Sequence, residues 1–140
     1  MTRDEVMALS EQELCAEIAK EFGWEFCQES WYDEEGVEGT RITSPEGKEF
    51  FAYGWGERCS LDDIKELPDW PNDIKAAFEL EESIPENERN HYAACLDILI
   101  IKDIKTLFTE DGKIFHWFIS HATAEQRSRA WLIWKKESEK

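Results

Sequence analysis

The sequence lacks a long apolar segment. Its longest unbroken aliphatic run covers residues 98–101, whereas a membrane-spanning helix needs roughly 20 apolar residues. The opening residues 1–5 also lack the apolar core of a signal peptide. We therefore expect no membrane association and a cytoplasmic location.

Residues that commonly carry chemistry are few, with 4 cysteines and 3 histidines in the chain. No two cysteines form a CxxC pair, which favours reduced thiols over disulfides or a zinc site. A glycine-rich phosphate loop and a nucleophile elbow are also missing. The sequence therefore predicts no metal site and no cofactor, and it identifies no catalytic residue. The cysteines are Cys15, Cys27, Cys59 and Cys95.

The histidines leave one enzymatic alternative open. His116 has apolar neighbours on both sides, which is typical of a hydrogen-bonded core residue, and His121 stands just before a predicted helix. His91 precedes a predicted strand. None of the three histidines has a metal-ligand spacing on a predicted helix. A hydrolase that pairs His116 or His121 with a cysteine or a carboxylate remains an alternative, because such pairs form in space rather than in sequence.

Basic residues are scarce beside acidic ones. The chain has 32 Asp and Glu against 16 Lys and Arg, a formal net charge of −16. Residues 1–90 carry 25 acidic and 8 basic residues, and residues 91–140 carry 7 and 8. Such a surface repels phosphate groups, so we expect no direct binding to nucleic acid or to acidic lipid. The acidic surface either serves solubility alone or is shaped for a basic partner.

Helix starts are marked by capping boxes, in which a Ser or Thr is followed three residues later by Glu or Gln. The apolar pattern extends these helices to about residues 9, 22 and 136, and Gly23 is expected to end the second. A further helix is predicted over residues 73–84, after an extended arm, with Asn72 as its cap. The boxes are Thr2 with Glu5, Ser10 with Glu13, and Thr123 with Gln126.

The remaining patterned segments are predicted strands. Two of them are apolar on both faces, which indicates that helices cover both sides of the sheet. Residues 45–48 have the proline and glycine of a hairpin loop. We therefore predict a single α/β (α+β) domain over residues 1–140. Its antiparallel or mixed sheet of four or five strands is covered by helices on both faces, an α-β-α sandwich. The predicted strands cover residues 24–28, 40–44, 49–53, 92–101 and 113–120.

Two groups of residues are candidates for binding a small ligand. Trp70 lies on the extended arm beside Asn72 and Asp73, where it could wall a small pocket or pack under the following helix. Arg127 and Arg129 lie near a helix N-terminus, where they could meet an anion or form an exposed helix face. These five residues are the predicted ligand site.

Four stretches, taken in order, carry a family resemblance. They are the opening residues 1–9, the helix with Leu14 and Ile18 that ends at Gly23, the arm-to-helix stretch 67–77, and the closing stretch 121–132. Together they resemble the phage ABA sandwich domain proteins, small accessory proteins of bacteriophages and prophages. The resemblance implies an α-β-α fold and a phage or prophage setting, and it supplies no catalytic residues.

These observations favour a non-enzymatic, acidic binding protein of phage or prophage origin that acts on host machinery. Its expected partner is a host protein with a basic surface. Three alternatives stay open: sequestration of a small anionic, nucleotide-like ligand, inhibition by mimicry of nucleic acid, and a hydrolase. Basic residues in an aromatic-lined cavity would indicate the first alternative, and a histidine beside a nucleophile or metal in an open cleft would indicate the third.

Overall fold

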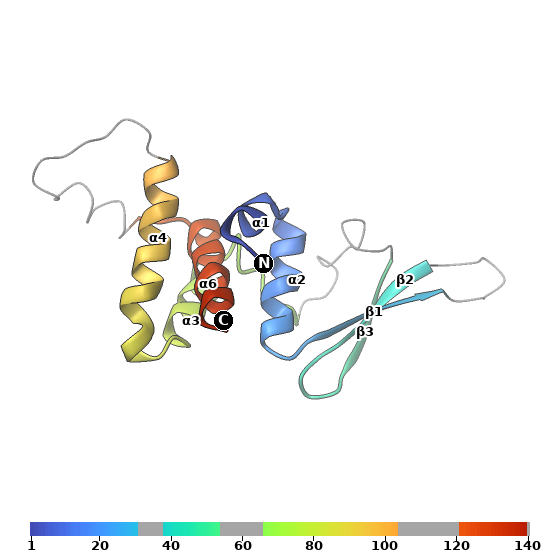
Figure 1. Cartoon of the computed structure of the whole chain (residues 1–140). Coiled ribbons are helices and arrows are strands. Elements are labelled where there is room, and N and C mark those ends of the chain that lie inside the picture. The colour runs from blue at the N-terminus through green and yellow to red at the C-terminus, as the bar shows by residue number, and fades with distance from the viewer. Residues whose placement is uncertain (31–37, 54–65, 104–120, 140) are drawn as a thin grey trace, which may run out of the picture. The chain divides into compact units, whose positions relative to one another are not determined.

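The structure is a computed structural model that describes residues 1–30, 38–53, 66–103 and 121–139. The chain divides into two compact units, whose helices and strands are labelled in Figure 1. One unit combines Met1–Ala8 with Asp69–Lys140, and the other is Leu9–Pro68. Each is described by itself, and the single domain over residues 1–140 stays a prediction.

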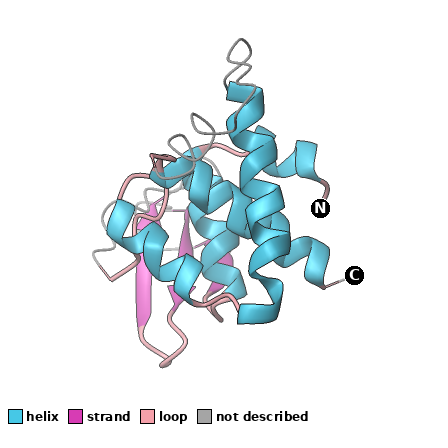
Figure 2. Cartoon of the chain, turned by 90° about the vertical axis from the view of Figure 1, so that its left-hand side faces the viewer, coloured by secondary structure: helices cyan, strands magenta, loops and turns pink. Residues whose placement is uncertain are grey.

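The first unit is built around α6 (Ala124–Ser138). Its residues 127–134 are all buried, and a helix buried around its whole circumference needs neighbours on several sides. Three helices pack against it, as Figures 1 and 2 show. They are α1 (Arg3–Ala8), α3 (Ile74–Glu82) and α4 (Arg89–Asp103), with the short 3-10 helix η3 (Glu86–Glu88) between the last two.

The α4 helix corrects the prediction of a strand over residues 92–101. Its buried residues recur at steps of three and four, the period of a helix, whereas Ala93 and Ala94 are exposed. A run of apolar residues broken only by Asp97 satisfies the patterns of helix and strand alike, but the two alanines favour helix. The buried set is Tyr92, Cys95, Leu96, Leu99 and Ile100.

The start of α3 corrects the predicted cap. Asp73, not Asn72, is the N-cap residue, and its side chain accepts a hydrogen bond from the backbone N–H of Lys75. The Asn72 amide instead donates to the carboxylate of Asp69. An aspartate adds a negative charge at the positive end of the helix dipole, which favours it over asparagine at this position.

Substituting Asp73 with alanine is expected to lower the free energy of unfolding by about 0.5–2 kcal/mol, because an N–H of the first turn loses its acceptor. Asn72→Ala serves as the matched control, and we expect it to change stability by no more than about 0.5 kcal/mol because the side chain is exposed. Urea denaturation of the two variants measures both values. A larger loss for Asn72→Ala would mean that the cap is assigned to the wrong residue.

The second unit contains α2 (Glu11–Glu21) and a three-stranded antiparallel sheet in the order β1-β2-β3, drawn in magenta in Figure 2. The strands are β1 (Glu25–Ser30), β2 (Glu38–Thr43) and β3 (Glu49–Tyr53). Leu14 and Ile18 of α2 and Ile42 of β2 are fully buried. Leu14 and Ile18 lie on the apolar face of α2 that the sequence predicts, and α2 begins with the predicted capping box of Ser10 and Glu13.

Two glycines shape this unit as the sequence predicts. Gly23 has a φ of 91° and follows α2, where its N–H donates to the carbonyl of Lys20. The N–H of Trp24 donates to the carbonyl of Ala19, which completes a Schellman motif. Gly47 has a φ of 89° in the turn between β2 and β3. A side chain at either position would be strained at this positive φ.

The predicted α-β-α sandwich is wrong for the described residues. They form five α-helices and one sheet of three antiparallel strands, a mixed α+β arrangement without the predicted four or five strands between helices. The error comes from residues 92–101, which the apolar pattern predicts to be a strand and which lie in α4. The predicted strand over residues 113–120 lies outside the described residues. In the described part of the chain, no helix is both long and apolar enough to cross a membrane.

Candidate functional site

Arg127, one of the predicted ligand-binding residues, is buried within the first unit, which we call the helical unit. Its Nη1 donates to Glu81 Oε1, its Nε donates to the carbonyl of Ala122, and its guanidinium lies over the ring of Phe78 at 4.8 Å. The Tyr92 hydroxyl donates to the same Glu81 oxygen at 2.7 Å. Burial, together with the Glu81 charge, raises the pKa of Tyr92, so its hydroxyl stays a neutral donor. The Glu81 carboxylate of α3 therefore binds both Arg127 of α6 and Tyr92 of α4.

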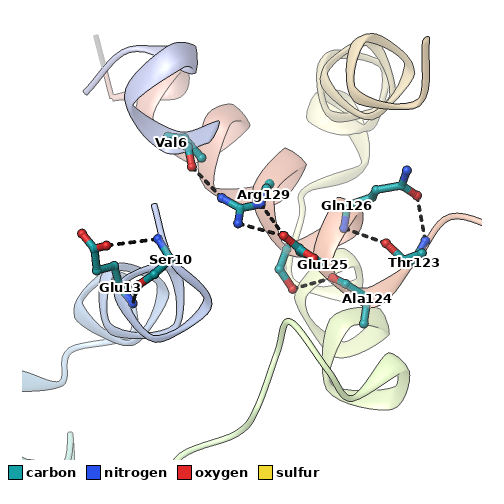
Figure 3. Close-up of polar contacts among 9 residues, drawn as sticks. Val6, Ser10, Glu13, Thr123, Ala124, Glu125, Gln126 and Arg129 are labelled. Atoms are coloured by element: carbon teal, nitrogen blue, oxygen red, sulfur yellow. Dashed lines mark hydrogen bonds and ion pairs between the residues drawn. The ribbon is translucent and has the colours of Figure 1, made fainter. Parts of the chain in front are cut away.

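Arg129 is also turned inward, as Figure 3 shows. Its Nε and Nη2 donate to Glu125 Oε1 one turn earlier in α6, and its Nη1 donates to the backbone carbonyl of Val6. The carbonyl of Val6 lies in the last turn of α1, where helices leave carbonyls without an intrahelical partner. Arg129 thus ties α1 to α6. The expectation of an exposed helix face at Arg127 and Arg129 is wrong, because their exposed fractions are 6% and 8%.

The other predicted ligand residues lie at the start of α3. Trp70 is 5% exposed, in agreement with packing under the helix rather than with an open pocket wall. Asn72 and Asp73 are exposed and form the local hydrogen bonds described above. These contacts give each of the three a structural task, and ligand binding by the five residues stays a prediction.

A second cluster lies where α4 meets the end of α6, and sequence reasoning missed it. His91 Nε2 is 2.7 Å from Glu137 Oε2, and Cys95 Sγ is 3.7 Å from the same oxygen. The three ligand atoms all lie within 4.8 Å of one another. Arg3 of α1 donates from Nε to the other oxygen, Glu137 Oε1. Side chains from α1 and α4 thus meet at one carboxylate, that of Glu137 in α6.

The electrostatics of this cluster are set by Glu137. A hydrogen bond from Arg3, assisted by one from His91, lowers the pKa of Glu137 to about 2, so the group is a carboxylate at neutral pH. Burial, with a further contribution from the Glu137 charge, raises the pKa of the Cys95 thiol to about 11. A thiol with a raised pKa is a poor nucleophile at neutral pH. The cluster is therefore unsuited to cysteine catalysis.

The spacing of two of these residues in the sequence indicates the cluster only if residues 92–101 are a helix, and the sequence predicts a strand there. His91 and Cys95 are four residues apart, which places them on one face of a helix but about 13 Å apart along a strand. Only the helix brings both side chains to a single carboxylate. Glu137 lies 46 residues from His91 and gives no local signal.

The histidines named for a hydrolase do not form this cluster. His121 is exposed just before α6, and His116 lies outside the described residues. Comparison of the chain with protein-family models, with curated proteins and with solved structures found no match.

Proposed function

We propose that the protein is a non-enzymatic, acidic binding protein of phage or prophage origin that binds the basic surface of a host protein. The observation that carries this proposal is the inward orientation of Arg127 and Arg129. These are the cations that an anionic ligand would need, and each guanidinium is paired with a carboxylate inside the helical unit. Among the described residues, the exposed charged side chains are mostly acidic.

Among the described side chains, the exposed charged residues are 13 acids and 5 bases. This excess is larger than the twofold excess in the whole composition. The acids are Asp4, Glu5, Glu11, Glu25, Glu46, Glu49, Glu66, Asp69, Asp73, Glu79, Glu82, Glu86 and Glu139, and the bases are Arg3, Lys20, Lys48, Lys75 and Arg89.

The solvent face of α3 is the part of this surface that best fits a protein partner. Ile74 and Phe78 are four residues apart, share one face, and are 43% and 44% exposed. Glu79 and Glu82 stand exposed beside them. Protein interfaces commonly combine a small apolar centre with a polar rim. A partner with an apolar patch ringed by lysine or arginine would complement this face, and charge attraction would speed its association.

Capture of bacterial host proteins on the immobilised chain, at low and at high salt, tests the proposal. We expect a specific protein to be retained at low salt and released at high salt, because the attraction between exposed charges is screened. The retained protein is then purified, and its affinity is measured for two triple variants that change the net charge equally. One is Glu79→Gln, Glu82→Gln and Glu86→Gln in the α3 region, and the other is Glu13→Gln, Glu17→Gln and Glu21→Gln in α2.

The α3-region variant is expected to weaken binding about tenfold at low salt, from three rim charges at about 0.5 kcal/mol each. The α2 variant is expected to leave binding nearly unchanged. Equal losses for both would show attraction to net charge alone, and retention that ignores salt would contradict the acidic mechanism. Displacement of the partner by duplex DNA would favour the nucleic-acid mimic.

A further inference from the structure

We propose that His91, Cys95 and Glu137 bind one Zn²⁺ ion between α4 and the end of α6. The ligands would be His91 Nε2, Cys95 Sγ and Glu137 Oε2. This inference is independent of the acidic binding function, since it concerns a different set of residues. Its support comes from the convergence of the three atoms, from the groups that hold the ligands, and from the balance of charge.

The three candidate ligand atoms all lie within 4.8 Å of one another. In tetrahedral zinc sites the metal lies about 2.0–2.3 Å from N, O and S ligands, which puts neighbouring ligand atoms about 3.3–3.6 Å apart. Cys95 Sγ and Glu137 Oε2 lie 3.7 Å apart, close to that separation. His91 Nε2 and Glu137 Oε2 lie 2.7 Å apart. Admitting the ion therefore requires these two atoms to move apart by roughly 0.6 Å. The third pair, His91 Nε2 and Cys95 Sγ, lies within 4.8 Å and must come to about the same separation.

Two of the ligands have partners on their far sides, as metal ligands usually do. Glu88 Oε2 lies 3.7 Å from His91 Nδ1 and accepts a hydrogen bond from Trp134 Nε1 at 3.2 Å. At 3.7 Å the contact with His91 is longer than a hydrogen bond, and a small approach of Glu88 to Nδ1 would orient the ring so that Nε2 faces the metal. Arg3 holds Glu137 through Oε1, which leaves Oε2 directed at His91 and Cys95.

Charge and ligand type favour zinc over the other common ions. A thiolate and a carboxylate together neutralise a divalent cation. The negative charge of Glu88 offsets the positive charge of Arg3. Nitrogen and sulfur ligands suit Zn²⁺, whereas Ca²⁺ and Mg²⁺ prefer oxygen ligands alone. The raised pKa of the Cys95 thiol describes the metal-free state, because a bound cation deprotonates a coordinating thiol. Three protein ligands leave a fourth position for water or for a group from a partner.

Titration of the reduced full-length chain with Co²⁺, a spectroscopic substitute for Zn²⁺, tests the site. We expect one equivalent to produce a thiolate-to-cobalt charge-transfer absorption together with the intense visible bands of four-coordinate cobalt, and Zn²⁺ to displace it. Cys95→Ser is expected to abolish the charge-transfer band. Separate titrations of His91→Ala and Glu137→Gln are expected to show affinity at least about tenfold weaker. Glu88→Gln is expected to weaken binding by about tenfold while the band remains.

Cys27→Ser is the matched control, because Cys27 is an exposed thiol in β1 and available to adventitious metal. It should change neither the stoichiometry nor the spectrum. Far-UV circular dichroism checks that each variant is folded, and a rise in melting temperature with Zn²⁺ in the wild type but not in Cys95→Ser gives a second readout. Retention of the charge-transfer band in Cys95→Ser, its loss in Cys27→Ser, or the absence of a one-equivalent endpoint in the wild type would overturn the proposal.

Discussion

Replacing Arg127 with methionine is expected to lower the free energy of unfolding by about 3 kcal/mol. Breaking a buried ion pair costs roughly 3–5 kcal/mol, because the remaining charge is left without a partner. The low end of this range applies because Glu81 retains 24% side-chain exposure and a hydrogen bond from Tyr92. Guanidinium denaturation of the variant measures the loss.

A double-mutant cycle separates the ion pair from the packing of the long side chain. Glu81→Gln alone is expected to destabilise the helical unit, because Arg127 then lacks its counter-charge. Combining it with Arg127→Met should cost less than the sum of the two single changes, with an interaction free energy of about 1–3 kcal/mol. Strict additivity would mean that Arg127 acts through its contacts with Phe78 and Ala122 rather than through Glu81.

Leu132→Ala is the second change with a large expected effect. Leu132 is fully buried in α6, the helix against which α1, α3 and α4 pack. Truncating a buried leucine to alanine costs roughly 2–5 kcal/mol, from lost burial and from the cavity left behind. We expect the upper half of this range, because neighbours on several sides of α6 limit the collapse of the cavity. Thermal denaturation followed by circular dichroism measures the change.

Leu132→Met is the matched control because it keeps the volume and apolar character of the side chain. It is expected to cost less than about 1.5 kcal/mol. Similar losses for the methionine and alanine variants would show that the shape of the site, rather than its burial, sets the cost. A loss below about 1 kcal/mol for Leu132→Ala would place this residue outside the core.

The parts of the structure that the sequence predicts correctly depend on neighbouring residues. The capping boxes at Ser10 and Thr123 join residues three apart, and both form as expected. Gly23 ends α2 with a positive φ, a conformation that is open to glycine whatever the distant residues are. Helices α2, α3 and α6 lie within two residues of their predicted bounds at either end.

The parts that the sequence could not predict depend on distant residues. Arg127 and Arg129 sit on a strongly polar stretch of sequence, and they are buried because Glu81 and the carbonyl of Val6 lie opposite them in the fold. The run from Tyr92 to Ile100 suits helix and strand alike, and its packing against α6 selects the helix. The candidate metal centre was missed for the same reason, since it exists only if His91 and Cys95 share a helical face.

The helical state of residues 89–103 thus carries both the fold of this unit and the candidate metal centre. Backbone chemical shifts from nuclear magnetic resonance test it most directly. A helix predicts consecutive Cα shifts downfield of random-coil values. It also predicts nuclear Overhauser contacts from the α-proton of each residue to the amide proton of the third residue along. His91 and Cys95 would then be separated by about 6 Å along the helix axis. Consecutive upfield Cα shifts with cross-strand amide contacts would contradict the helix and place the two side chains about 13 Å apart.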